Sequence, residues 1–168
     1  VRVNFDSVIR LVNLVGGVEV YSDRAFTARN GDTFTQGYNY MDGARALVFA
    51  RERYAFAEGD RIRGQNQERV IEALIKKMSQ PSQLAHFGAV FEAMQGGFET
   101  NMPGDQIAQV VSDQLKSGAD WTIDRASVDG TGLMAPTYTY GSQDLYVMVP
   151  DEATVAAAHE QIAAVLAE

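Results

Sequence analysis

Apolar and polar positions at the start of the chain follow first a strand pattern and then a helix pattern. Residues 1–5 (VRVNF) alternate as in a β-strand, and residues 6–17 (DSVIRLVNLVGG) carry apolar side chains at helical spacing, with Asp6 or Ser7 as the N-cap and a closing glycine pair. Residues 18–23 (VEVYSD) alternate again. A strand, a helix and a strand joined by short connections are typical of α/β layer packing, so the pattern predicts this fold class.

The remainder of the chain continues the mixture of helices and strands. Turn-forming residues mark the ends of the expected helices, several of which open at Asp or Pro and close at Gly. The sequence contains no internal repeat or linker, so we expect one domain over residues 1–168. The expected segments are a turn-rich surface excursion over 24–34, helices over 43–50, 60–78, 81–97, 103–118 and 151–168, and strands over 121–128 and 144–149 with a loop between them that holds Gly130, Gly132 and Gly141.

Composition narrows the class of protein. A chain of 168 residues with 46% hydrophobic and 10% aromatic residues is long enough to bury a core and is typical of a globular protein. Cysteine is absent, which excludes disulfides, thiolate nucleophiles and cysteine-ligated metals. No apolar run approaches the roughly 20 residues of a membrane-spanning helix, and the N-terminal residues lack the basic flank and cleavage site of a signal peptide.

Charge is distributed unevenly along the chain. The net charge is −1 over residues 1–44, +3 over residues 45–77 and −10 over residues 78–168, in agreement with the total of −8. A pI near 4.7 argues against a nucleic-acid-binding protein, because such a protein needs a basic face to displace counterions. The local basic island suits a small, compact anion instead.

The basic island is centred on residues 51–67, RERYAFAEGDRIRGQNQ. On a helix that begins at Asp60, the side chains of Asp60, Arg63 and Gln67 share one face at about 100° per residue, whereas Arg61 points away from it. Charged groups on a buried face need partners, because an unpaired charge removed from water costs several kcal/mol. This helix alone is compatible with an internal ion pair between Asp60 and Arg63 and also with a ligand site.

Arg51 and Arg53 favour the ligand site. At i and i+2 they diverge on a helix but project to the same side of an extended chain, so we expect the preceding helix to end near Ala50 and both guanidiniums to face the next helix. Three arginines, the positive end of a helix dipole and the Gln67 amide would bind a doubly charged anion such as a diphosphate. One carboxylate cannot neutralise three guanidiniums, so we expect Asp60 to orient Arg63 or Arg53.

The same helix face becomes apolar farther along the chain. Val70, Ile71, Leu74 and Met78 continue the stripe, and stripes of this kind usually belong to a core. In the alternative interpretation, the stripe forms one wall of a groove for the apolar tail of a lipid whose charged head group binds the arginines. The candidates for the opposite wall, on the next helix, are Phe87, Val90, Phe91 and Met94.

The sequence holds three motifs in a fixed order: FDSVIRLVNLVGGVEV, MDGARALVFARERY and GDRIRGQNQERVIEALIKK. They resemble consecutive motifs of the LytR-CpsA-Psr (LCP) family of bacterial cell-envelope proteins, closely over most of residues 1–78 and more loosely beyond. The spacing between the Arg-x-Arg pair and the Asp-x-x-Arg-x-x-x-Gln helix makes the resemblance specific. It implies a three-layer α/β/α sandwich with a mixed central sheet, of which this chain is a single domain lacking its N-terminal portion.

The resemblance also implies a function. Members of the family are held outside the cytoplasmic membrane by an N-terminal transmembrane helix, bind polyprenyl diphosphate-linked glycopolymers and, with Mg²⁺, transfer the polymer through a phosphodiester to peptidoglycan or a related wall polymer. By the same resemblance, Arg51 and Arg53 grip the diphosphate, while Asp60, Arg63 and Gln67 belong to the site helix. The implied catalytic residues are Arg51, Arg53, Asp60 and Arg63, and the implied substrate contacts extend from the arginines and Gln67 to the apolar stripe.

Two features depart from the family pattern. Asn66 stands where the family often has Arg, so one positive charge is missing. The chain also opens partway into the family domain, without the half that carries the acidic Mg²⁺ ligands and another phosphate-binding Arg. We therefore expect the Mg²⁺ ligands in the missing N-terminal portion, no metal site in this chain, and no activity from this segment alone.

Two other functions are compatible with the sequence. The segment could be a non-catalytic module that binds or senses lipid-linked envelope precursors, or an inert scaffold with an internal Arg–Asp cluster. Turnover that depends on Mg²⁺ separates the enzyme from the sensing module, and affinity for diphosphate lipids separates both from the scaffold.

Overall fold

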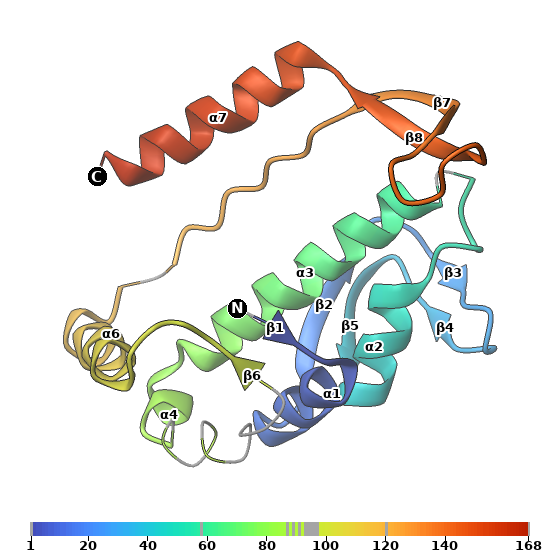
Figure 1. The fold of residues 1–168 in the computed structure, drawn as a ribbon. Helices are drawn as coiled ribbons and strands as arrows, with labels where there is room; N and C mark the ends of the chain where they lie inside the picture. The colour runs from blue at the N-terminus through green and yellow to red at the C-terminus, as the bar shows by residue number, and fades with distance from the viewer. Residues whose placement is uncertain are drawn as a thin grey trace. The chain divides into compact units, whose positions relative to one another are not determined.

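The computed structural model describes residues 2–57, 59–86, 88, 90, 92, 98–119 and 121–167 (Figure 1). Contacts divide the chain into one unit of Val1–Ile123 and a second unit of Asp124–Glu168. The expectation that residues 1–168 form a single domain stays a prediction.

The first unit combines helices with three pairs of short strands. The three sheets are β1–β6, β2–β5 and β3–β4, each with two antiparallel strands. Their elements, in chain order, are β1 (Arg2–Val3), α1 (Phe5–Leu14), β2 (Val18–Ser22), β3 (Phe26–Thr27), β4 (Thr33–Phe34), β5 (Gly37–Met41), α2 (Gly43–Arg51), α3 (Asp60–Met78), α4 (Pro81–Leu84), β6 (Phe98–Glu99) and α6 (Gly104–Ser117).

Local sequence signals set the ends of the first two helices. Helix α1 is capped by Asn4, whose Oδ1 accepts hydrogen bonds from the backbone N and the Oγ of Ser7, so the expected cap at Asp6 or Ser7 is wrong by a few residues. The glycine pair after α1 has the expected left-handed backbone, with φ of 78° at Gly16 and 84° at Gly17. Helix α2 is capped by Asp42, as expected, through a hydrogen bond from the backbone N of Arg45.

The core of this unit lies where α1, α2 and α3 meet the β2–β5 sheet. Alternate residues of β2 are buried, and α3 packs along this strand while α2 packs against both α1 and α3 (Figure 1). The β3–β4 hairpin joins the same core, because the Phe34 ring lies 5.3 Å from the Phe49 ring of α2. The turn-rich segment is thus anchored by its aromatic residues, although the sequence pattern predicts a surface excursion. The buried core residues are Val12, Val15, Val18, Val20, Ala28, Phe34, Met41, Ala46, Phe49, Ala50, Val70 and Leu74.

The close crossing of α1 and α2 depends on a glycine. Gly43, the first residue of α2, is buried, and its backbone N donates a hydrogen bond to Oδ1 of Asn13 at 2.8 Å. A Cβ at this position would lie 2.2 Å from the carbonyl oxygen of Ile9 and 2.7 Å from its Cα. Both atoms belong to the α1 backbone, which cannot rotate away as a side chain does.

The variant Gly43→Ala should therefore lower the free energy of unfolding by about 1–3 kcal/mol, the usual range for overpacking a close contact. Urea denaturation followed by circular dichroism measures this change. Gly64→Ala is the matched control, because a Cβ there meets nothing within 4 Å on α3, and an unobstructed helical Gly→Ala change stabilises by up to about 1 kcal/mol. Equal stability of the wild type and the Gly43 variant would contradict the packing argument.

The second unit contains a hairpin followed by a helix. Strands β7 (Gly130–Pro136) and β8 (Asp144–Pro150) pair antiparallel over their full lengths, and α7 (Glu152–Leu166) begins after the N-cap Asp151, whose Oδ1 accepts from the backbone N of Thr154. Residues 121–128 form no strand, so the strand expected there is wrong. The strand that pairs with β8 is β7, which lies in the segment interpreted as a glycine-containing loop. Gly132 suits a strand here, because a Cβ would lie 2.4 Å from Oη of Tyr146 on the neighbouring strand.

Together these elements confirm the expected α/β class. Every strand pair in the described part of the chain is antiparallel, with two strands in each sheet. Among the described residues, no helix is both long enough and apolar enough to cross a membrane.

Candidate functional site

The loop between α2 and α3 is organised by a buried carboxylate. The side chain of Glu52, the C-cap residue of α2, accepts backbone hydrogen bonds from Arg53 at 2.9 Å, Tyr54 at 2.6 Å and Ala55 at 3.0 Å. Its other oxygen accepts from the backbone N of Arg29, in the turn of the β3–β4 hairpin, at 2.8 Å. One side chain therefore fixes the path of the loop and ties it to the hairpin.

The pKa of Glu52 reflects these contacts. Burial, the largest single effect, raises the pKa of this carboxyl group, since the residue is only 5% exposed. The four backbone N–H donors act in the opposite direction and together outweigh burial, so the pKa of Glu52 lies below its ordinary value of 4.5. Glu52 is therefore a structural anion at neutral pH, and its charge belongs to the loop rather than to a ligand.

Two of the predicted arginines converge on one carboxylate oxygen. Oδ1 of Asp60 lies 3.3 Å from Nη1 of Arg53 and 3.5 Å from Nη2 of Arg63. The side chains remain accessible, at 41% exposure for Arg53, 37% for Arg63 and 65% for Asp60. Ion pairs this exposed are worth about 0–1 kcal/mol, so an anion of higher charge can compete with Asp60 for the two guanidiniums.

Tyr54 adds an aromatic platform beside Arg53. Nη2 of Arg53 donates a hydrogen bond to the Tyr54 hydroxyl at 2.9 Å, and the guanidinium carbons of Arg53 and Arg29 lie 4.8 and 4.9 Å from the centre of the Tyr54 ring. The bond to Tyr54, followed by the bond to Asp60, raises the pKa of Arg53, and the hydrogen bond from Arg53 lowers the pKa of the Tyr54 phenol. Arg29 is thus a further cation beside Tyr54, and the sequence analysis did not predict it.

The start of α3 is open to an anion. Its N-cap is Gly59, which has no side chain to accept a hydrogen bond from the first turn and has φ of 43°. Asp60, in the first turn, and the adjoining guanidiniums surround the positive end of the helix dipole. We define the anion cluster, named for the anion that it would bind, as Arg53, Arg63, Asp60, Tyr54 and Arg29.

Arg51 contacts an aromatic ring that is not part of the anion cluster. Helix α2 continues through Arg51, so the extended-chain geometry expected for the pair Arg51 and Arg53 is wrong. On the helix, the Arg51 guanidinium lies over the Phe5 ring at the start of α1, 4.7 Å from its centre. Its side chain is exposed. Its role in substrate binding stays a prediction.

The buried face of α3 is rotated from the expected one. Asp60 and Gln67 are exposed and Arg63 is half-buried, whereas Ile62 and Asn66 are buried. The expectation that Asp60, Arg63 and Gln67 lie on the buried face of α3 is therefore wrong. The physical reason lies at Asn66, whose amide has polar partners inside the protein.

Asn66 joins α3 to the end of α2. It is 1% exposed, and its Nδ2 donates to the backbone carbonyl of Phe49 at 3.2 Å, which satisfies a carbonyl in the last turn of α2. Its Oδ1 accepts from Nη1 of Arg69 at 3.4 Å, and Arg69 also pairs with Asp23 after β2. The position at which the family often has Arg is thus occupied here by a buried structural amide.

The apolar stripe of α3 belongs mainly to the core. Val70 is 3% exposed and Leu74 is 8% exposed, both within the core cluster, and Met78 packs against it. Ile71 is 56% exposed. The structure thus supports the core interpretation for Val70, Leu74 and Met78, and lipid contact by the stripe stays a prediction. Of the proposed opposite wall, Val90 is buried, while Phe87, Phe91 and Met94 lie outside the described residues.

The anion cluster suits phosphate binding better than metal binding. Two guanidiniums share one carboxylate and leave an excess of positive charge, and planar guanidinium groups match the oxygens of a phosphate. Within the part of the chain that the structure describes, no three Asp, Glu or His side chains group together as metal ligands.

Comparison with known proteins places these features in a wider context. The model of the LytR_cpsA_psr family matches residues 1–156. The polyisoprenyl-teichoic acid–peptidoglycan teichoic acid transferase TagU of Bacillus mycoides is 38% identical over 107 residues, covering 64% of this chain and 35% of the relative. TagU of Halalkalibacterium halodurans is 30% identical over 153 residues, covering 90% of this chain and 47% of the relative.

A solved structure shares the fold. The crystal structure of B. subtilis TagV matches with a TM-score of 0.72 and 25% sequence identity, over 95% of this chain and 60% of that one. The chain spans about half the length or less of the two sequence relatives. The similarity thus covers most of this chain but only part of the proteins that it resembles.

Proposed function

The chain belongs to the LytR-CpsA-Psr family, and on that premise we propose that it is part of a phosphotransferase that attaches a glycopolymer to the cell wall. The donor is a polyprenyl diphosphate-linked glycopolymer and the acceptor is a hydroxyl of peptidoglycan or a related wall polymer. The names of the relatives, which join a polyisoprenyl-linked teichoic acid to peptidoglycan, support this assignment. The observation that carries it is the convergence of Arg53 and Arg63 on Asp60 at the open start of α3.

The proposed chemistry is a displacement at phosphorus. The oxygen of the acceptor hydroxyl forms a bond to the phosphorus that carries the glycopolymer and loses its proton to solvent. The bond from this phosphorus to the oxygen bridging the two phosphates breaks, and polyprenyl phosphate leaves with the electron pair of that bond. Such transfers depend mainly on positioning and on neutralising charge at the phosphate oxygens. Arg53 and Arg63 would bind these oxygens, and Asp60 would hold both guanidiniums in place before the substrate arrives.

Further substrate contacts are proposed from the family resemblance. The exposed Arg51 and Gln67 side chains would bind phosphate or the first sugar, and the exposed Ile71 would contact the prenyl chain. We propose that the Mg²⁺ that the family resemblance implies is held by acidic residues outside this chain. When bound, it would neutralise charge on the diphosphate. We further propose an extracytoplasmic location and an N-terminal membrane anchor, both from the resemblance.

A binding or sensing module is the second candidate. The anion cluster can bind a diphosphate without turning it over, so the segment taken alone is compatible with this interpretation. The full-length protein should be incubated with Mg²⁺, a polyprenyl diphosphate-linked glycopolymer and peptidoglycan. We expect polyprenyl phosphate release together with a phosphodiester-linked product, and loss of both when EDTA is added. Saturable donor binding without product would favour the sensing module.

A further inference from the structure

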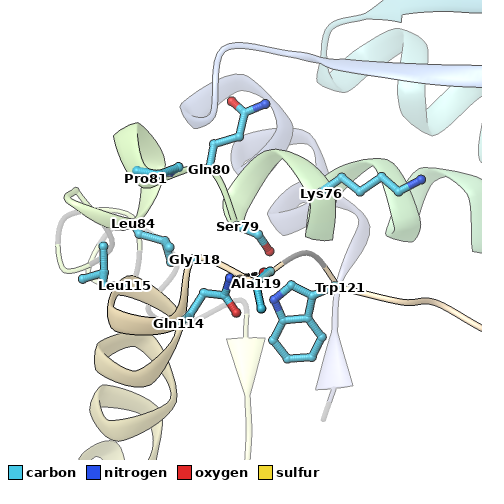
Figure 2. Close-up of a pocket in the computed structure, with 10 residues that line it drawn as sticks. All are labelled: Lys76, Ser79, Gln80, Pro81, Leu84, Gln114, Leu115, Gly118, Ala119 and Trp121. Carbon is cyan, nitrogen blue, oxygen red and sulfur yellow. Dashed lines mark hydrogen bonds between the residues drawn. The ribbon is translucent and has the colours of Figure 1, made fainter.

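A pocket lies at the opposite end of α3 from the anion cluster. Figure 2 shows this pocket between the end of α3, helix α4, the C-terminal part of α6 and the segment that follows it. Its volume is about 490 Å³, within the range of small-molecule binding sites. The lining residues are Lys76, Ser79, Gln80, Pro81, Leu84, Gln114, Leu115, Gly118, Ala119 and Trp121. We call this site the α3–α6 pocket.

The wall that carries Trp121 is held by specific contacts. Helix α6 ends at Gly118, whose left-handed backbone (φ of 60°) turns the chain back toward α3. Nε2 of Gln114 then donates a hydrogen bond to the Ala119 carbonyl at 2.7 Å, which fixes the returning segment against α6. As a result, the indole of Trp121 lies beside Gln114 and Ala119 at the mouth of the pocket (Figure 2).

The chemistry of the lining combines an aromatic face with polar groups. Trp121 is 49% exposed, although an indole ring normally gains from burial. The Ser79 hydroxyl donates a hydrogen bond to the Ile75 carbonyl at 2.8 Å, so the lone pairs of its Oγ remain available as acceptors. Nζ of Lys76 donates to Glu72 at 2.7 Å, and its side chain runs along α3 away from the other lining residues (Figure 2). The carboxamide oxygen of Gln114 adds an acceptor, whereas the carboxamide of Gln80 points away from the other lining residues (Figure 2).

We propose that the α3–α6 pocket binds a pyranose ring of an N-acetylated glycan. The apolar face of a pyranose stacks on an indole, its hydroxyl groups need donors and acceptors around the rim, and an acetamido group pairs with a carboxamide such as that of Gln114. A prenyl chain would contact only the apolar part of this lining and would use none of its polar groups.

The distance along α3 gives the pocket a role separate from the diphosphate site. Lys76 lies 16 residues beyond Asp60, which corresponds to about 24 Å along a helix. Several linked sugars span such a distance, so one glycan strand can contact both ends of α3. The identity of that strand as the donor or acceptor polymer rests on the proposed function, whereas binding of a pyranose does not.

Tryptophan fluorescence tests the proposal directly, because Trp121 is the only tryptophan in the sequence. Titration of the 168-residue chain, or of a full-length protein that holds no other tryptophan, with an N-acetylglucosamine tetramer should produce a saturable change in emission. Calorimetry should show that Trp121→Ala weakens binding by about tenfold or more, that Trp121→Tyr keeps most of the affinity, and that Lys76→Met weakens it less than Trp121→Ala does.

Arg53→Ala is the control that separates this site from the diphosphate site. It should bind the tetramer as tightly as the wild type does, even if transfer of the glycopolymer is lost or was never present. No saturable response of the wild type to the tetramer would overturn the proposal, as would equal affinity in Lys76→Met, Trp121→Ala and the wild type. A saturable Trp121 response to farnesyl diphosphate that persists in Arg53→Ala would assign the pocket to lipid instead.

Discussion

Glycopolymer transfer should fall by about 10³-fold or more when Arg53 is replaced by alanine in the full-length protein, a loss of the size seen when a transition-state arginine is removed. Arg53 contacts Asp60 and the Tyr54 hydroxyl and remains 41% exposed, so its guanidinium is both held in place and accessible to phosphate. Only weak surface contacts are removed with it. The thermal midpoint should therefore stay nearly unchanged while polyprenyl phosphate release, measured as initial rate, disappears.

The charge and the geometry of Arg53 can be separated by a second variant. Arg53→Lys keeps a positive charge but loses the planar fork that binds two phosphate oxygens at once, so it should recover only a small part of the rate. Arg61→Ala is the matched control, because this exposed arginine follows Asp60 directly but points away from the shared face. Wild-type transfer by Arg53→Ala would refute the assigned role.

The largest effect on stability should come from Glu52→Ala. The variant leaves the backbone N–H groups of Arg29, Arg53, Tyr54 and Ala55 without their acceptor, in a region that is 5% exposed at Glu52 itself. Hydrogen bonds to charged groups contribute about 1.5–3 kcal/mol each, and water can replace some of them, so we expect a loss of about 4 kcal/mol in the free energy of unfolding. Urea denaturation at pH 7 measures this loss.

The pH dependence of this loss has a defined sign. Because the pKa of Glu52 is lower in the folded protein than its ordinary value of 4.5, the stabilisation is complete above that value and is lost as the pH falls through the folded pKa. The difference in stability between the wild type and Glu52→Gln, which cannot ionise, should shrink as the pH is lowered from 6 toward 3. Glu19→Gln, at an exposed position of β2, serves as the control. A difference that grows on acidification would contradict the role of Glu52 as a buried anion.

The sequence predicts those elements whose ends carry strong local signals. Helix α3 runs over Asp60–Met78, as its apolar period predicts, and Asp42 caps α2. Side-chain orientation is harder to predict. The buried face of α3 is turned by about 60° from the expected face, because the amide of Asn66 finds a partner in the Phe49 carbonyl, a contact between distant residues that no periodicity reveals.

The candidate site shows the same division. Arg53, Asp60 and Arg63 come together, as expected from their spacing, whereas Arg51 lies over Phe5 because α2 extends one residue farther than expected. Glu52 was hidden by its neighbours, since a carboxylate between two arginines resembles an ordinary solvated charge run. Its burial depends on four backbone donors that only the folded loop supplies. The one sequence signal for the role of Glu52 was its position between Arg51 and Arg53.

The hydrogen bond that the backbone N of Arg29 donates to Glu52 joins the β3–β4 hairpin to the loop between α2 and α3, although 23 residues separate these two residues in sequence. An insertion in the hairpin turn would move the backbone of Arg29, pull on the carboxylate and shift Arg53 without changing any residue that touches substrate. We therefore expect the length of this turn to affect where the Arg53 guanidinium lies.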